Sequence, residues 1–209
     1  KSEEQLAIHR QAARICDDMF EALRRELKKP RPGFQLQAEM ERVARYAGAE
    51  YCMTWLTIGP QADYSRFFRD ECARTPQAGD QVIAGIYLIF DGHWGHAIRS
   101  GTMGPASQPH RELHTIAMSM ADAMQSHLRT GEDLNLAQAA AENTIGANFP
   151  AEQVAQIFRF RHGHGLGHSY EDPVTSQPFP QIYDTNPPKP TPVLAQPGML
   201  FELHPNLFV

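Results

Sequence analysis

The feature that most constrains the fold is a pair of long β-prone runs joined by a two-residue turn. Residues 81–90 (QVIAGIYLIF) and 93–104 (HWGHAIRSGTMG) flank the dipeptide Asp91-Gly92. Asp-Gly between such runs favours a tight β-hairpin, because both residues tolerate the left-handed backbone conformation that this turn requires. The sequence therefore predicts an antiparallel pair of strands. Residues 51–59 (YCMTWLTIG), rich in β-branched and aromatic side chains, are a candidate third strand.

Helices are predicted on both sides of this hairpin. Ser2 and Gln5 form a capping box at the start of a helix over residues 2–28, whose apolar residues recur at helical spacing. The further predicted helices cover residues 36–47, 109–130, 133–147 and 151–158. The closing run 198–209 is expected to be a strand, and the proline-rich stretch 173–197 a long loop. Helices and hairpins in mixed order indicate an α+β fold.

Composition and charge exclude several classes of protein. The chain has 209 residues and a net charge of −5, and it has no basic run, so nucleic acid is a poor candidate partner. Its longest apolar stretch, near 82–90, is too short to span a membrane. The three cysteines are widely spaced, which is typical of reduced thiols in a cytoplasmic protein. Because the chain begins at Lys1 and stops inside an apolar run, we expect it to be part of a longer protein.

A glycine–histidine stretch is the candidate functional motif. Residues 158–173 (FRFRHGHGLGHSYEDP) contain three of the chain's ten histidines, followed by two acidic residues. Histidine is a common metal ligand, and it is also the side chain that most readily exchanges a proton near neutral pH. The residues by themselves leave open a metal site, a metal-free acid–base site and the remains of a site that has lost its activity.

Three segments, taken in order, resemble the creatinase/aminopeptidase family, which includes methionine aminopeptidases, prolidases and creatinase. They are residues 79–104, the GHGLG motif at 163–167 and PGMLFELHP at 197–205. The opening residues also resemble the usual start of the family's catalytic domain, so the match covers nearly the whole chain. The resemblance implies the pita-bread fold, with two pseudo-symmetric halves of helices and antiparallel sheet. We expect these halves at residues 1–104 and 105–209, in a single domain over 1–209 that lacks a preceding N-terminal domain and the terminal strand.

The resemblance also implies that most of the family's metal ligands are replaced. The metal enzymes of the family hold two divalent ions with two Asp, one His and two Glu. The first aspartate position falls on Gly85, the second on His96, the histidine on His164 and the first glutamate on His204. The second glutamate would lie on a later strand that this chain does not contain. Two dications held close together need bridging carboxylates, so we expect no dinuclear centre.

Three interpretations remain open. The preferred one is a small-molecule hydrolase or lyase that uses histidine and glutamate acid–base chemistry without a metal, as creatinase does. The expected catalytic residues are His96, His164, Glu171, Glu202 and His204, and the expected substrate-binding residues are Arg66 and His168. The second interpretation is a single zinc or other divalent ion held by His96, His164 and His204. The third is a binding module without catalysis. By analogy with the family we expect a homodimer.

Overall fold

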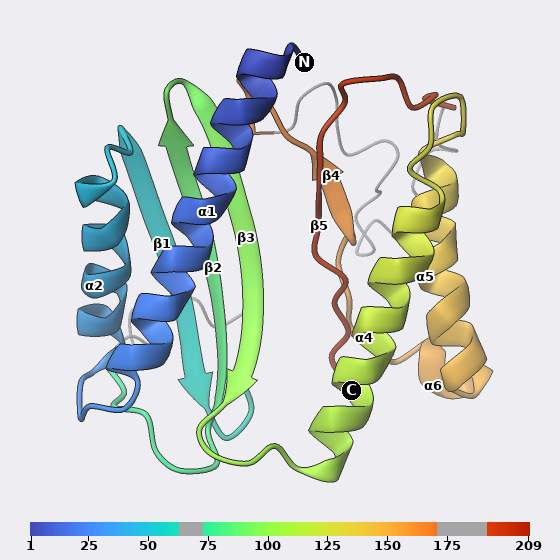
Figure 1. The fold of residues 1–209 in the computed structure, drawn as a ribbon. Helices are drawn as coiled ribbons and strands as arrows, with labels where there is room; N and C mark the ends of the chain where they lie inside the picture. The colour runs from blue at the N-terminus through green and yellow to red at the C-terminus, as the bar shows by residue number, and fades with distance from the viewer. Residues whose placement is uncertain (63–72, 171–191) are drawn as a thin grey trace. The chain divides into compact units, whose positions relative to one another are not determined.

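The computed structural model describes residues 1–62, 73–170 and 192–209 (Figure 1). The chain divides into two compact units, an N-terminal unit of Ser2–Ala106 and a C-terminal unit of Ser107–Val209 together with Lys1. The observed boundary after Ala106 lies two residues beyond the predicted one after Gly104. Each unit combines helices with an antiparallel sheet, as an α+β fold requires.

The N-terminal unit contains a three-stranded antiparallel sheet in the order β1-β2-β3. Its strands are β1 (Tyr51–Gly59), β2 (Gln81–Phe90) and β3 (His93–Thr102). Asp91 and Gly92 join β2 to β3 with φ values of 47° and 69°, the left-handed conformation expected of this hairpin turn. The predicted bounds of β1 and β2 are confirmed, and β3 ends two residues earlier than predicted.

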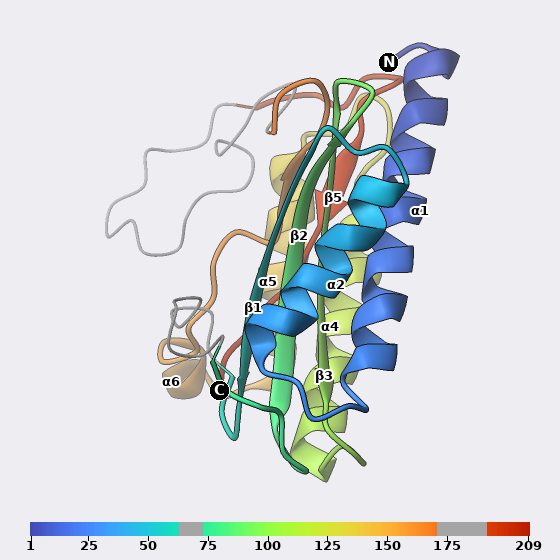
Figure 2. The ribbon, with the colours of Figure 1, turned by 90° about the vertical axis from the view of Figure 1, so that its left-hand side faces the viewer.

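Helices α1 (Glu3–Glu26) and α2 (Gly33–Tyr46) cover one face of this sheet (Figure 2). The capping box is confirmed, since Ser2 Oγ accepts from the Gln5 backbone while the Gln5 side chain accepts from the Ser2 backbone. Helix α2 begins at Gly33 rather than at residue 36, because Pro32 acts as its N-cap. Side chains from both helices form one core with every second residue of the sheet. This core includes Ile15, Met19, Leu36, Met40, Leu56, Ile58, Ile86 and Leu88.

The opposite face of the sheet carries the residues of functional interest. Strand register places Trp55 opposite Gly85, and Tyr87 opposite His96. Since side chains alternate across a strand, these four positions lie on the face that α1 and α2 do not cover.

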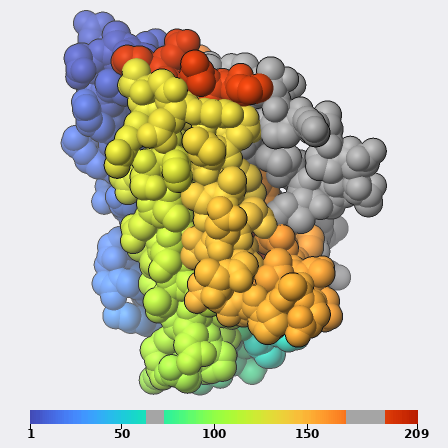
Figure 3. All heavy atoms as spheres, turned by 90° about the vertical axis from the view of Figure 1, so that its right-hand side faces the viewer, coloured from blue at the N-terminus to red at the C-terminus, as the bar shows by residue number. Residues whose placement is uncertain are grey.

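The C-terminal unit contains helices α4 (Gln108–Ser126), α5 (Asn135–Asn148) and α6 (Ala151–Val154). Helices α4 and α5 lie side by side (Figure 3), and their apolar faces share a core that includes Met120, Met124, Ala141 and Ile145. The predicted helix over 151–158 is shorter than expected, and α4 ends before residue 130. Most of the predicted loop over 173–197 lies outside the described residues.

A short two-stranded antiparallel sheet completes this unit. Its strands are β4 (Gly163–Gly165) and β5 (Phe201–Leu203). The prediction of one strand over 198–209 is wrong in its extent, because Pro205 has no N–H to continue a ladder. Within the described part of the chain, no helix combines the length and apolarity needed to cross a membrane.

Candidate functional site

The β4–β5 ladder brings together three of the predicted site residues. His164 pairs with Glu202 across the ladder, and His204 follows β5 directly. Glu202 Oε2 lies 3.3 Å from His204 Nε2 and 3.9 Å from His164 Nε2. The two imidazole rings are 5.4 Å apart between centroids, and all three side chains are buried. One ligand atom from each residue lies within 4.8 Å of the other two, so the three could hold one ion or share one proton-transfer site.

The hydrogen bonds of His164 define its tautomer. Nδ1 lies 2.8 Å from the Gly165 carbonyl, which can only accept, so Nδ1 carries the proton. Nε2 therefore presents its lone pair, and it accepts from the Tyr170 hydroxyl at 3.1 Å. Tyr170 is a site residue that the sequence analysis missed, although it lies within the glycine–histidine stretch. A histidine held in this way can accept a proton or bind a metal through Nε2.

His96 is held in the same tautomer on β3 of the N-terminal unit. Its Nδ1 donates to the Ile86 carbonyl at 2.6 Å, which places the ring proton on Nδ1. The ring stacks on its cross-strand neighbour Tyr87 at 4.5 Å between centroids. His96 is therefore a buried and oriented imidazole rather than a loose surface residue.

The resemblance assigns Gly85 to the position of the family's first metal-binding aspartate, and the space beside Gly85 is filled. A Cβ atom built at Gly85 would overlap Cε2, Cζ2 and Nε1 of the Trp55 indole. The position therefore lacks both a ligand atom and the room for one. The same resemblance assigns His96 and His204 to the second aspartate and first glutamate positions, and with these residues the position set does not fit a dinuclear centre with bridging carboxylates.

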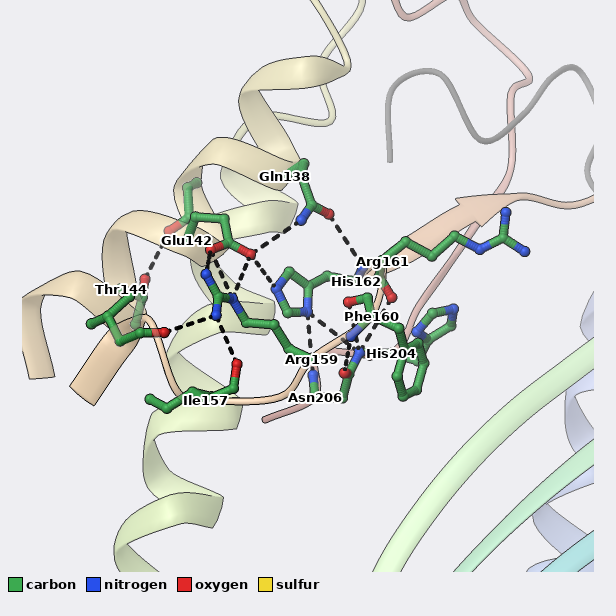
Figure 4. Close-up of polar contacts among 12 residues, drawn as sticks. Gln138, Glu142, Thr144, Ile157, Arg159, Phe160, Arg161, His162, His204 and Asn206 are labelled. Atoms are coloured by element: carbon green, nitrogen blue, oxygen red, sulfur yellow. Dashed lines mark hydrogen bonds and ion pairs between the residues drawn. The ribbon is translucent and has the colours of Figure 1, made fainter. Parts of the chain in front are cut away.

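A second polar cluster lies against the glycine–histidine stretch (Figure 4). Glu142 on α5 accepts from Arg159 at 2.8–3.1 Å and from His162 Nε2 at 3.1 Å. Burial opposes ionisation of Glu142, but the hydrogen bonds from His162 and Arg159 outweigh it and lower the pKa to about 2. Glu142 is therefore a carboxylate at neutral pH, and the sequence analysis did not identify it.

The remaining predicted site residues are described less fully. His168 is exposed, and its predicted role in substrate binding stays a prediction. Arg66 and Glu171 lie outside the described residues, so their predicted roles also stay predictions.

Solved structures of other proteins share the fold of this chain. The helices and antiparallel sheets have the pita-bread fold, which several solved structures share. Aminopeptidase PepP from Pseudomonas aeruginosa matches with a TM-score of 0.81 at 19% identity, over 100% of this chain and 48% of that one. Prolidase from Pyrococcus furiosus matches with a TM-score of 0.77 at 18% identity, over 96% and 55% of the two chains. Xaa-Pro dipeptidase from Bacillus anthracis matches with a TM-score of 0.78 at 17% identity, over 100% and 55%.

The model of metallopeptidase family M24 matches residues 7–209, and the chain belongs to this family. It spans about half the length of the solved structures that it matches. At their level of identity the likeness to those structures establishes the fold. A comparison with curated protein sequences found no significant match.

Proposed function

We propose that this chain is the catalytic part of a small-molecule hydrolase or lyase that works without the dinuclear centre of its family. The observation that carries the proposal is the Trp55 indole, which fills the space beside Gly85 where the first aspartate would project. The proposal keeps the fold of the family but not its two-ion chemistry. The names of the matched structures, an aminopeptidase, a prolidase and an Xaa-Pro dipeptidase, suggest hydrolysis of a C–N bond as the first reaction to test.

The proposed mechanism assigns proton transfer to His164. Its Nε2 lone pair accepts from the Tyr170 hydroxyl, so Tyr170 would pass its own proton to Nε2 while it takes one from the substrate or from an attacking water, and the same route would return the proton to the leaving group. Glu202 and His204 form a buried pair beside it that can orient a polar or cationic substrate group. By its family position His96 is proposed as a further histidine of the site, with Tyr87 holding its ring.

Three further residues complete this proposal: Arg66 and Glu171, which lie outside the described residues, and the exposed His168. Arg66 would bind a substrate carboxylate through two parallel hydrogen bonds, and Glu171 would assist acid–base catalysis. His168 would contact the substrate from the exposed end of the glycine–histidine stretch.

A second candidate is a hydrolase with one divalent ion. His164, Glu202 and His204 would hold the ion, with His96 as a further ligand. The observation that favours it is the shared tautomer of His96 and His164, because metal-binding histidines usually donate their other N–H to a carbonyl or carboxylate. Such an ion, when bound, would polarise a carbonyl or lower the pKa of a water.

The test is turnover before and after exhaustive chelation. Purified protein is offered Xaa-Pro dipeptides and small amides, and products are followed by NMR. The metal-free mechanism predicts that activity survives chelation, and that His164→Ala lowers it by about 10²–10⁴-fold while the fold is kept. The matched control is His110→Ala on α4. Activity that disappears on chelation and returns with one equivalent of Zn²⁺ would favour the one-ion candidate.

If wild type binds these compounds without converting any of them, and His164→Ala binds them equally well, the binding-module interpretation becomes the better one. We further propose a homodimer, by analogy with the creatinase-like members of the family. Sedimentation of the full-length protein tests this, and a monomer at micromolar concentration would contradict it.

A further inference from the structure

The alignment of β4 with β5 needs an explanation. The two strands have three residues each, and a two-stranded ladder is marginally stable by itself. Yet this ladder determines where His164, Glu202 and His204 stand relative to one another. Additional contacts must therefore hold its register.

Asn206 supplies a dense set of such contacts. Its Nδ2 donates to the carbonyls of Phe160, Arg161 and His204 at 3.3, 3.2 and 3.0 Å. Its Oδ1 accepts from the Phe160 backbone at 2.9 Å. One side chain thus ties the segment before β4 to the segment after β5, where Pro205 prevents a regular ladder.

His162 continues this connection into helix α5. Its carbonyl accepts from the His204 backbone at 2.8 Å, and its Nδ1 accepts from the Asn206 backbone at 3.3 Å. A backbone N–H can only donate, so Nδ1 carries no proton and the ring proton is on Nε2. Nε2 then donates to Glu142 at 3.1 Å. His162 is therefore held in the opposite tautomer to His164, two residues away.

Glu142 is itself firmly held. Arg159 binds it through two guanidinium nitrogens and also donates to the carbonyls of Val154 and Ile157 at 3.1 and 2.9 Å. Figure 4 shows the His162 ring pointing toward Glu142, whereas the His204 ring lies away from that carboxylate. The chain of hydrogen bonds runs from α5 through His162 to Asn206.

We propose that His162 and Asn206 are positioning residues, which fix the places of His164, Glu202 and His204 through the Glu142–His162–Asn206 chain. This inference rests on the proposed function. It assigns proton transfer to His164 and a positioning role to His162 within the same histidine-rich stretch. His162 is fully buried and uses both ring nitrogens within the protein, so it contacts neither substrate nor ion. Its effect on the reaction is exerted through the geometry of its neighbours.

The experiment reads the histidine tautomers directly by two-bond ¹H–¹⁵N NMR of the ¹⁵N-labelled protein at pH 7. In wild type, the proton is expected on Nε2 of His162 and on Nδ1 of His164. Asn206→Asp keeps the size of the side chain but removes its donor group and places a carboxylate against three carbonyl oxygens. Asn206 Nδ2 lies 3.5 Å from His162 Nδ1, so a carboxylate in its place would attract the ring proton to Nδ1. We therefore expect the tautomer of His162 to change and the His164 signals to shift. The control is Asn148→Asp on α5, where the native side chain donates to the Thr144 carbonyl, and it should leave both rings unchanged.

A second pair of variants covers the outcome that Asn206→Asp does not fold. In His162→Asn, Oδ1 takes the place of Nδ1 and can still accept from Asn206, whereas His162→Ala cannot. The His164 tautomer should survive in the first variant and be lost in the second. For any substrate that wild type converts, kcat should fall by about 10²-fold in Asn206→Asp with KM little changed, since misplacement by about 1 Å has effects of this size.

Two results would overturn the positioning role. One is a wild-type spectrum with the His162 proton on Nδ1. The other is a folded Asn206→Asp or His162→Ala protein whose His164 signals match wild type. If the tautomers respond as expected but wild type converts no substrate, the proposed function fails while the positioning role stands.

Discussion

Replacing Gly85 by alanine tests the claim that the Trp55 indole fills the space beside Gly85. The added Cβ would overlap three atoms of the buried Trp55 indole, so the ring or strand β2 must move. Overpacking of this kind costs about 1–3 kcal/mol, and the lower entropy of unfolded alanine returns about 0.4–1 kcal/mol. We expect a net loss of about 1–2 kcal/mol in the free energy of unfolding, which for a chain of this size lowers Tm by about 2–8 °C.

The matched control is Gly101→Ala on β3 of the same sheet. Neither glycine has a positive φ, so alanine is compatible with the backbone at both positions. Among the described residues, no atom lies within 4 Å of a Cβ at Gly101, so this variant should be neutral or more stable than wild type by up to about 1 kcal/mol.

A double-mutant cycle with Trp55→Ala isolates the cause. Once the indole is removed, Gly85→Ala should cost nothing, which corresponds to a coupling energy of about 1–3 kcal/mol. Urea unfolding followed by circular dichroism measures all four proteins. Equal effects of the two glycine substitutions, or a Gly85→Ala cost that persists without Trp55, would refute the reasoning. The same packing predicts that Gly85→Asp binds no more ions than wild type does. Isothermal titration of both proteins with Zn²⁺ or Mn²⁺ would show this.

Three further predictions follow from the other sites. The pKa of Glu142, about 2, is below its unfolded value, so its stabilising effect is complete above about pH 4.5 and is lost as the pH falls toward 2. Glu142→Gln should therefore lower the free energy of unfolding by about 2–3 kcal/mol at pH 7. In urea unfolding, the difference in this free energy between wild type and variant should narrow below about pH 4.5 and approach zero near pH 2. An unchanged difference down to pH 2 would contradict this. Burial, with a smaller effect of Glu41, raises the pKa of Cys52 to about 12, so iodoacetamide at pH 8 should label Cys52 much more slowly in the native protein than in guanidinium. Tyr170→Phe removes the hydroxyl at His164 Nε2 and should lower kcat by about 10²-fold with the fold retained, and equal turnover would exclude Tyr170 from the mechanism.

Local features of the sequence determined much of the secondary structure. The Asp91-Gly92 turn connects neighbouring residues, so the hairpin could be predicted from the dipeptide and the β-prone runs beside it. The Ser2–Gln5 capping box likewise depends on side chains three residues apart. In the C-terminal unit, alternation along a strand and the family motifs were enough to identify His164, Glu202 and His204 as candidates.

Tertiary structure alone decided how these candidates are arranged and supported. Trp55 and Gly85 are brought opposite each other by the register of β1 against β2, and a shift of one residue would have turned the indole to the other face. Glu142 reaches His162 from α5, and Asn206 reaches Phe160 across the end of β5. Spacing along the chain does not encode such pairs, because helix packing and strand register place residues that are far apart in sequence. For this reason the sequence could name the histidines only as candidates, whereas the fold determined their tautomers and the lack of space beside Gly85.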